Sequence, residues 1–186
     1  MHPVFEELYD RYWTSLEGKD CDSCQLHPAR SFHGHGPAWS TQEVIEHLLL
    51  TYRSTGALFD RYLERNSPTQ SSRNAKHRVL QFLVVRCGGF PRGVNAPGHA
   101  QPGKSGMPLM SGNELSKCMR AELEKLDAKI DECRRAFERR PVAAHFIFGP
   151  LTADQWRRFH FVHGKHHLKQ LNRIRKQTAG GTPSKV

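Results

Sequence analysis

Residues 155–171, with the sequence QWRRFHFVHGKHHLKQL, contain four histidines within eight positions of a segment that is predicted to form one helix. Three of them, His160, His163 and His167, are spaced i, i+3 and i+7, which places them on one side of a helix. That side is otherwise apolar and is predicted to face the core. A buried polar ring without a hydrogen-bond partner costs roughly 1–3 kcal/mol. The spacing therefore predicts that these imidazoles have partners inside the protein.

A divalent metal ion is one partner that suits His163 and His167. Their i, i+4 separation allows two ring nitrogens to approach the same ion, as in helices that carry an HExxH motif. Two ligands are too few, so a third is expected from another segment of the chain. The competing interpretation is that these histidines are core residues whose ring nitrogens bind water or helix ends.

The length and composition are those of one globular domain. The chain has 186 residues, of which 37% are hydrophobic and 25% charged, and no apolar run approaches the ~20 residues of a membrane helix. Acidic residues within the first ten positions do not fit an export signal, so we expect a cytoplasmic protein without a membrane partner. The expected domain covers residues 1–177, and residues 178–186 are expected to be a disordered tail.

The chain is basic, with a formal net charge of +10 and an isoelectric point near 9.7. Such an excess can indicate nucleic acid, an anionic membrane or an acidic substrate. Here acidic residues interrupt the basic ones, and no aromatic residues alternate with them as in single-strand binders. We therefore favour a solvated helix surface over a nucleic-acid interface. The residues concerned are Arg134, Arg135, Arg139, Arg140, Arg157, Arg158, Lys169, Arg173, Arg175 and Lys176.

Helical periodicity without strand signals predicts an all-α fold, a four-helix bundle with a long crossover loop and an extra short helix. Capping-box sequences predict helix starts at Ser40 and Thr152. Residues 88–110, rich in Gly and Pro, are expected to form either a mobile lid or a crossover at one end of the bundle. The expected helices cover residues 3–18, 40–66, 76–87 and 111–140, with a last one that begins at Thr152 and reaches the tail. The helix over 76–87 is apolar enough to be covered on most sides, the one over 111–140 carries an apolar stripe at 3-4 spacing, and residues 141–151 are expected to be a short apolar connector.

The expected inward side of the second long helix has polar residues at its middle. It contains Val44, His47, Thr51, Ser54 or Thr55, Leu58 and Tyr62 at helical spacing. A single histidine on such a stripe is more often a hydrogen-bonded core residue than a metal ligand. Small polar neighbours one turn further on are nevertheless typical of a cavity, and bundle metal sites use side chains of facing helices.

Three segments carry a resemblance to a known family. They are WSTQEVIEHL at residues 39–48, HFIFGPLT at residues 145–152 and WRRFHFVHGKHHLKQ at residues 156–170. The first and third resemble the signature ends of the DinB-like, or YfiT-like, metal-binding four-helix superfamily. The connector between them is similar to the linker of one of its uncharacterised branches. The resemblance extends over nearly the whole chain in the order and length of its helices.

The resemblance implies that His47, His163 and His167 hold a divalent ion, with zinc and nickel equally suited to three imidazoles. Three protein ligands leave a position open for water or substrate, as in catalytic sites. The implied activity is a metal-dependent hydrolase or a thiol-dependent transferase that acts on a small molecule, the latter with a low-molecular-weight thiol as cofactor. A non-catalytic binding protein, stabilised by metal and using its basic surface for nucleic acid or an acidic partner, is the alternative.

Other side chains near the motif have weaker predicted roles. His160 lies one turn before His163 and is the candidate catalytic residue, as a proton carrier or as a group that supports the ligands. His166 is a weaker candidate, and His145 is expected to bond the connector rather than a metal. No carboxylate beside the HxxxH pair is expected to act as a base, because Glu46 points about 100° away from His47 on the helix. Exposed bundle faces leave room for a homodimer.

A second constellation, Cys21-x-x-Cys24-x-x-His27 followed by His33 and His35, competes for the role of a metal or redox site. No second CxxC is present and the context is not that of a redox fold, so a loop with incidental cysteines is favoured. An odd number of cysteines, five, argues against a disulfide framework. The remaining three, Cys87, Cys118 and Cys133, are expected to be small apolar core residues.

Overall fold

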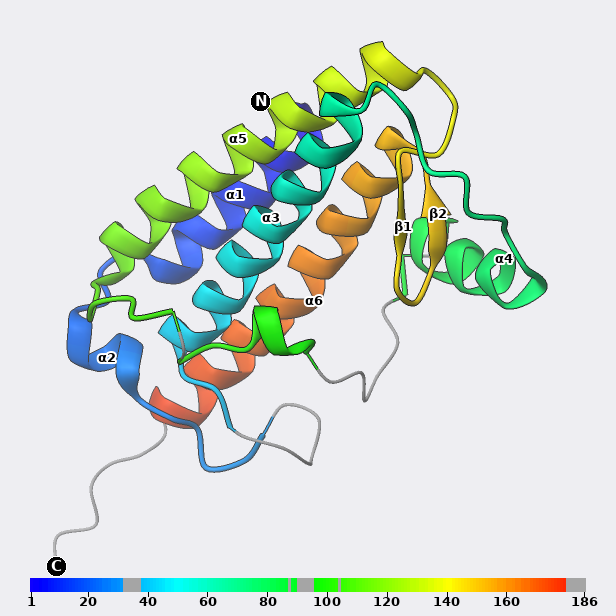
Figure 1. The fold of residues 1–186 in the computed structure, drawn as a ribbon. Helices are drawn as coiled ribbons and strands as arrows, with labels where there is room; N and C mark the ends of the chain where they lie inside the picture. The colour runs from blue at the N-terminus through cyan, green and yellow to red at the C-terminus, as the bar shows by residue number, and fades with distance from the viewer. Residues whose placement is uncertain (32–37, 87, 90–95, 104, 180–186) are drawn as a thin grey trace, which may run out of the picture.

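The computed structural model describes residues 1–31, 38–86, 88–89, 96–103 and 105–179, and within these ranges the fold is mostly helical, as predicted. The long helices α1, α3, α5 and α6 lie side by side as a bundle, with α4 and a β-hairpin beside one end (Figure 1). No helix in the described ranges is long and apolar enough to cross a membrane. The helices are α1 (Pro3–Leu16), α2 (Cys21–Gln25), α3 (Thr41–Glu64), α4 (Ala75–Gln81), α5 (Gly112–Phe137) and α6 (Ala153–Ala179), and the strands are β1 (Ala143–His145) and β2 (Gly149–Leu151).

The apolar stripe of α5 forms much of the core, as its 3-4 spacing predicts. Every predicted inward residue is buried, and the helix packs against α1, α3 and α6. Removing these side chains from water contributes about 25 cal/mol per Å² of apolar area, which is the main force that holds the bundle together. The stripe comprises Leu115, Met119, Leu123, Leu126, Ile130, Cys133 and Phe137.

The two predicted capping boxes are confirmed. The Ser40 hydroxyl accepts from the Glu43 backbone N–H at 3.2 Å, and the Glu43 carboxylate accepts from the Ser40 N–H at 2.8 Å. Thr152 and Gln155 form the same reciprocal pair at the start of α6. Each box satisfies donors that a helix start leaves without intrahelical partners, so α3 and α6, which carry the histidines, begin at positions encoded locally.

The predicted inward side of α3 is only partly correct. His47 and Val44 are buried, but Thr51, Leu58 and Tyr62 are half-buried. Tyr52 and Phe59 are buried instead, together with Ile45, Leu48 and Leu49. The helix touches both α5 and α6, so its buried surface is wider than one stripe and is rotated towards its larger side chains.

Residues 141–151, predicted as an irregular connector, contain a short antiparallel hairpin. Ala143 pairs with Leu151, and His145 pairs with Gly149, whose φ of +67° places it in the left-handed region. The Gln81 side chain donates to the Phe148 carbonyl at 2.7 Å and attaches α4 to this hairpin. Strands of three residues are too short to show a period of two, so the sequence pattern contained no signal for them.

The predicted helix over residues 76–87 was expected to be covered on most sides, and this was wrong. The α-helix ends at Gln81 and continues as one π-helical segment, Phe82–Arg86. Val79 and Phe82 are about three-fifths exposed, at 61% and 60%. Within residues 75–84, whose burial is described, Gln81 and Val84 are buried, so one narrow side of this segment faces the protein and its apolar outer side faces solvent.

Helix ends differ from their predicted positions by a few residues. Helix α1 ends at Leu16, before Gly18 with its positive φ of +74°. Helix α6 reaches Ala179, so Thr178, predicted in the tail, is helical and its hydroxyl donates to the Ile174 carbonyl at 3.1 Å. Residues 180–186 of the predicted tail lie outside the described ranges.

One residue of the predicted solvated basic surface is buried. Arg157 is 4% exposed, and its guanidinium lies 2.9 Å from the Asp127 carboxylate and 2.8 Å from Asp131. Asp127 is also 4% exposed and accepts a hydrogen bond from the His2 backbone N–H at 2.6 Å. Arg157 therefore joins α6, α5 and the N-terminus inside the bundle, whereas most other residues of the predicted surface are exposed.

Gly112 occupies a position where the backbones of α1 and α5 almost touch. A Cβ atom there would lie 1.9 Å from the Leu16 carbonyl oxygen, which belongs to the rigid end of α1. We predict that Gly112→Ala lowers the free energy of unfolding by about 1–3 kcal/mol, because the two helix ends must move apart. Gly56→Ala, in α3 with no atom within 4 Å of its Cβ, is the control and should stabilise by about 0.5–1 kcal/mol. Urea unfolding measures the stability change of each variant. Equal changes for the two variants would contradict the close approach of Gly112 to the Leu16 carbonyl.

Candidate metal centre

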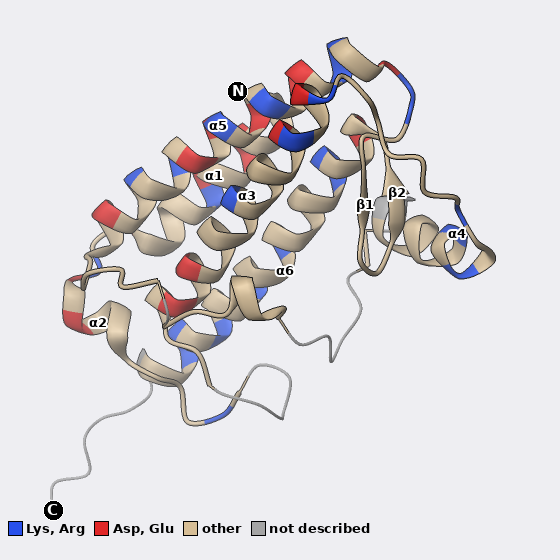
Figure 2. Cartoon of the chain, viewed as in Figure 1, with Lys and Arg blue, Asp and Glu red and all other residues tan. Residues whose placement is uncertain are grey.

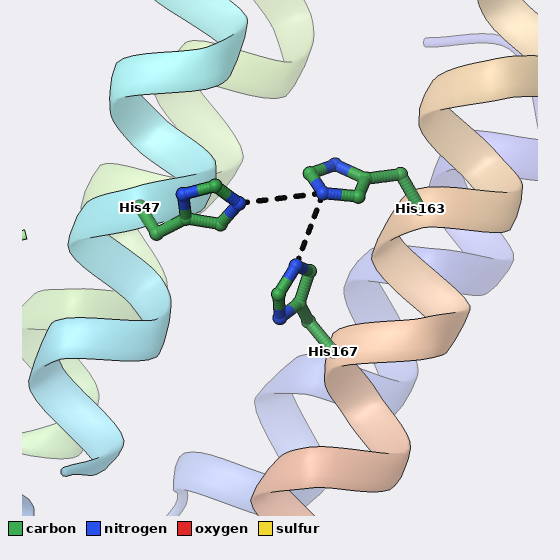
Figure 3. Close-up of side chains that lie close together, drawn as sticks. All are labelled: His47, His163 and His167. Atoms are coloured by element: carbon green, nitrogen blue, oxygen red, sulfur yellow. Dashed lines mark hydrogen bonds between the residues drawn. The ribbon is translucent and has the colours of Figure 1, made fainter. Parts of the chain in front are cut away.

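Three histidines from two helices meet inside the bundle. His47 of α3 faces His163 and His167 of α6, with their ring nitrogens directed at one another (Figure 3). The Nε2 atom of His163 lies 3.3 Å from Nε2 of His47 and 3.0 Å from Nε2 of His167. Candidate ligand atoms of all three lie within 4.8 Å of one another, and each residue is only 4–5% exposed. The residues that the sequence analysis selected as ligands are therefore brought together.

Hydrogen bonds at the far side of two rings determine which nitrogen carries the proton. His47 Nδ1 lies 2.6 Å from the Ala100 carbonyl, and His167 Nδ1 lies 2.8 Å from the Gln170 side-chain oxygen. Both oxygens can only accept, so Nδ1–H is the donor in each ring. The Nε2 atoms of these neutral imidazoles then carry lone pairs that point into the cluster. This arrangement is typical of metal-ligating histidines, whose other nitrogen donates to an oxygen.

The donor set fits a divalent cation. The Nε2 atoms of His47 and His167 carry no proton. A proton on His163 Nε2 could therefore form a hydrogen bond to only one of them, and the lone pairs of the other contact would repel each other. A tetrahedral ion with metal–nitrogen bonds of about 2.0–2.1 Å places its ligand nitrogens about 3.3 Å apart, close to the two spacings from His163, while the whole cluster spans no more than 4.8 Å. Three neutral imidazoles that converge in this way are better suited to bind one ion than to hydrogen-bond one another.

Burial favours the neutral form of His47 and His163. It lowers the pKa of His47, an effect that the hydrogen bond to Ala100 partly opposes. The pKa of His163 lies well below its ordinary value, because of burial first and then because of the neighbouring imidazoles of His167 and His47. A charged imidazole cannot bind a metal, so the surroundings favour the protonation state that ligation requires.

The described part of the crossover loop is bonded to the site. Its 3₁₀ turn, η2 (Gly98–Ala100), packs against α3 and supplies the carbonyl that binds His47. The Glu46 carboxylate accepts from the Gly103 N–H at 2.8 Å and from the backbone and hydroxyl of Ser105. Glu46 thus anchors the loop to α3. Residues 90–95 and 104 lie outside the described ranges.

Two further side chains of the site were not assigned a role from the sequence. The Trp39 ring stacks with His167 at 6.4 Å between centroids and lies 5.1 Å from His47. Gln170 is 6% exposed and orients His167. The i, i+3 spacing of Gln170 from His167 is a signal that could have identified it. A backbone carbonyl from a distant loop, such as that of Ala100, leaves no such signal.

His160 is fully buried one turn before His163 and is not part of the three-histidine cluster. Neither ring nitrogen has a hydrogen-bond partner among the described residues, and the same is true of the Tyr52 hydroxyl. Its ring packs against Trp156 and, edge to face, against Tyr52 at 5.5 Å. Burial, followed by the charge on His145, lowers the pKa of His160 to about 3. So low a value favours a hydrogen-bonding role over that of a proton carrier.

His145 hydrogen-bonds within the hairpin, as the prediction that it bonds the connector suggests. Its Nδ1 accepts from the Ile147 N–H at 3.1 Å and the Phe148 N–H at 3.4 Å, and its ring lies among Phe146, Phe148, Trp156 and Phe159. Burial lowers the pKa of His145 to about 3.

This pKa predicts a loss of stability in acid. The unfolded chain takes up a proton at His145 near its ordinary pKa of about 6.5, but the native state does not until about pH 3. The free energy of unfolding should therefore fall by up to about 1.4 kcal/mol per pH unit between these values. His145→Asn, which keeps an acceptor without titrating, should reduce the slope of stability against pH. His99→Asn, at an exposed site, should not, and equal slopes for both variants would refute this role.

The rival cysteine motif does not form a metal cluster in the described part of the chain. Burial raises the pKa of the Cys24 thiol to about 11, which opposes the thiolate needed for metal binding or redox exchange. His27 Nε2 instead lies 2.9 Å from a Glu43 carboxylate oxygen. Cys21, Cys24, Cys118 and Cys133 are free thiols. Cys133 is buried in the core as predicted, whereas Cys118, predicted as a core residue, is half-buried. His33, His35 and Cys87 lie outside the described residues.

Comparisons with known proteins find relatives whose descriptions assign no function. A family model described as a protein of unknown function, DUF1569, matches residues 111–174, which include His163 and His167. The uncharacterized protein YuaE of Bacillus subtilis (strain 168) is 25% identical over 184 residues, covering 94% of this chain and 96% of the relative. No solved structure matches. Neither match names the DinB-like superfamily, so that resemblance stays a prediction.

Proposed function

We propose that this protein is a divalent-metal-dependent enzyme that acts on a small molecule, with His47, His163 and His167 as the metal ligands. The observation that supports this most directly is that the Nε2 atoms of His47 and His167 lie 3.3 Å and 3.0 Å from the Nε2 atom of His163, and that both are freed for ligation by Nδ1–H hydrogen bonds. Three protein ligands leave a coordination position open, which distinguishes catalytic from structural sites. Zinc and nickel both suit three imidazoles.

The proposed chemistry is hydrolysis or the transfer of a low-molecular-weight thiol to an electrophile. A divalent ion held by the three imidazoles supplies Lewis acidity, which acidifies water or a thiol and polarises a carbonyl. Gln170 and the Ala100 carbonyl orient the ligands, and Trp39 covers two of them from solvent. His160, kept neutral by burial, is proposed to hydrogen-bond a polar group of the reactants.

Elemental analysis followed by turnover measurements tests this proposal. The purified protein is expected to contain about one zinc or nickel ion per chain, and a panel of esters, amides and thiol–electrophile pairs should turn over only with metal. A metal-free protein with no affinity for either ion would refute the site. A metal-loaded protein that turns over none of the panel, and instead binds DNA or RNA with a steep salt dependence that survives His163→Ala, would support a binding protein.

A further inference from the structure

Glu46 of α3 is a buried acidic residue that is bonded to the crossover loop. It is 4% exposed, and its carboxylate accepts from the Gly103 N–H at 2.8 Å, from the Ser105 N–H at 3.3 Å and from the Ser105 hydroxyl. A buried carboxylate needs such donors, because they offset the cost of removing its charge from water. Glu46 therefore binds the loop at two residues and holds it against α3.

The same loop supplies the oxygen that orients His47. The Ala100 carbonyl accepts from His47 Nδ1–H at 2.6 Å, and Ala100 is 2% exposed. Glu46 and His47 are neighbours in α3, and Gly103 follows Ala100 by three residues. Two adjacent helix residues thus bind two points of the loop that are close together in the chain. The position of the Ala100 carbonyl therefore depends on the contact at Glu46.

The composition of the loop gives this carbonyl little support of its own. Residues 96–110 contain three glycines and three prolines, and Gly103 has a positive φ of +79°. Glycine loses more conformational freedom on folding than any other residue, so ordering such a segment is costly. The 3₁₀ turn around Ala100 is closed by its N–H to the Pro97 carbonyl at 2.8 Å, and a single turn is not stable in isolation. Contacts outside the loop are therefore needed to hold the carbonyl at His47.

We propose that Glu46 is a positioning residue of the metal centre, which acts on His47 through the crossover loop. By holding the loop, it keeps the Ala100 carbonyl on His47 Nδ1–H, so that the Nε2 lone pair points into the cluster. Loss of a group that orients a ligating histidine typically lowers metal affinity about 10–100-fold. The part of this inference that concerns the metal rests on the proposed function, whereas the orientation of His47 is a property of the metal-free protein as well.

Nitrogen-15 NMR of the metal-free protein at mildly alkaline pH tests the orientation of His47, because protonated and unprotonated ring nitrogens differ in chemical shift. In the wild type, His47 and His167 should both carry the proton on Nδ1. In Glu46→Gln the amide replaces one acceptor oxygen by a donor, so the loop contact weakens and His47 should populate both tautomers. His167, which bonds Gln170, should stay unchanged and is the internal control. Identical His47 signals in the variant and the wild type would overturn the inference.

Zinc affinity, measured by competition with a chromophoric chelator, tests the consequence for the metal. Glu46→Gln is expected to weaken zinc binding by about tenfold or more. Glu43→Gln is the matched control, because both acidic residues lie in the first two turns of α3 (Figure 2), but the Glu43 carboxylate bonds Ser40 at the helix start. This control removes the same charge and should change the affinity less than about twofold. Equal losses in both variants would show that the ion responds to the charge and not to the loop, and would overturn the inference.

A second variant keeps the test decisive if Glu46→Gln does not fold, as judged by circular dichroism. Ser105→Ala removes one donor at an exposed position and retains the carboxylate. It should change the His47 signals and the zinc affinity in the same direction as Glu46→Gln, by a smaller amount. If Glu46→Gln is unfolded, unchanged His47 signals in Ser105→Ala would overturn the inference. A protein that binds no zinc would instead refute the proposed function, and the His47 signals would still decide whether Glu46 positions the ring.

Discussion

His163→Ala is expected to reduce the bound metal from about one ion per chain to a small fraction of that value. His163 is the central member of the cluster, because its Nε2 lies within 3.3 Å of both other Nε2 atoms. The remaining pair, His47 and His167, supplies too few ligands for a stable site. An ion at a thousand times its dissociation constant stabilises the folded state by about 4 kcal/mol, so added zinc or nickel should raise the melting temperature of the wild type and not that of the variant.

The measurements are elemental analysis and thermal unfolding, each with and without added metal. His166→Ala is the matched control, because His166 neighbours a ligand on the same helix but does not belong to the cluster. It should keep the full metal content and the full thermal shift. Comparison of the metal-free forms separates loss of the ion from loss of packing. Equal metal content in His163→Ala and the wild type would eliminate the three-histidine site.

Asp127→Ala is expected to destabilise the protein by about 3–5 kcal/mol, because it removes the buried partner of the Arg157 guanidinium and leaves only the more exposed Asp131 and Asp154. The cost of removing one member of a buried pair is mainly that of the charge left without compensation. Asp154→Ala is the control, since Asp154 lies 3.7 Å from the same guanidinium but its side chain is 74% exposed. Its effect should stay below about 1 kcal/mol.

Urea unfolding of these variants decides whether burial of the pair matters. Replacement of both partners by apolar residues, as in Asp127→Leu with Arg157→Met, should recover much of the loss, because no buried charge remains. If Asp127→Ala and Asp154→Ala have equal effects, the network contributes no more than a surface ion pair.

Features set by neighbouring residues could be predicted from the sequence. The stripe of α5 and the capping boxes of α3 and α6 depend on residues three or four positions apart, and all are present. Elements that depend on distant partners were predicted poorly. The hairpin is bonded to Gln81, a residue remote in sequence. Val79 of α4 and Phe82 directly after it are exposed, because only one narrow side of this segment packs against the rest of the protein.

The sequence alone determined which histidines are candidates and that a helical bundle carries them. Spacing on one helix selects His163 and His167, and the resemblance adds His47, because periodicity and cap chemistry are local properties of the chain. Only the tertiary structure decided that three Nε2 atoms meet, that the Ala100 carbonyl orients His47, and that Arg157 is buried while Arg173 is exposed. These outcomes depend on which helices pack together and at what rotation, which is set by side-chain volumes throughout the core and not by any single segment.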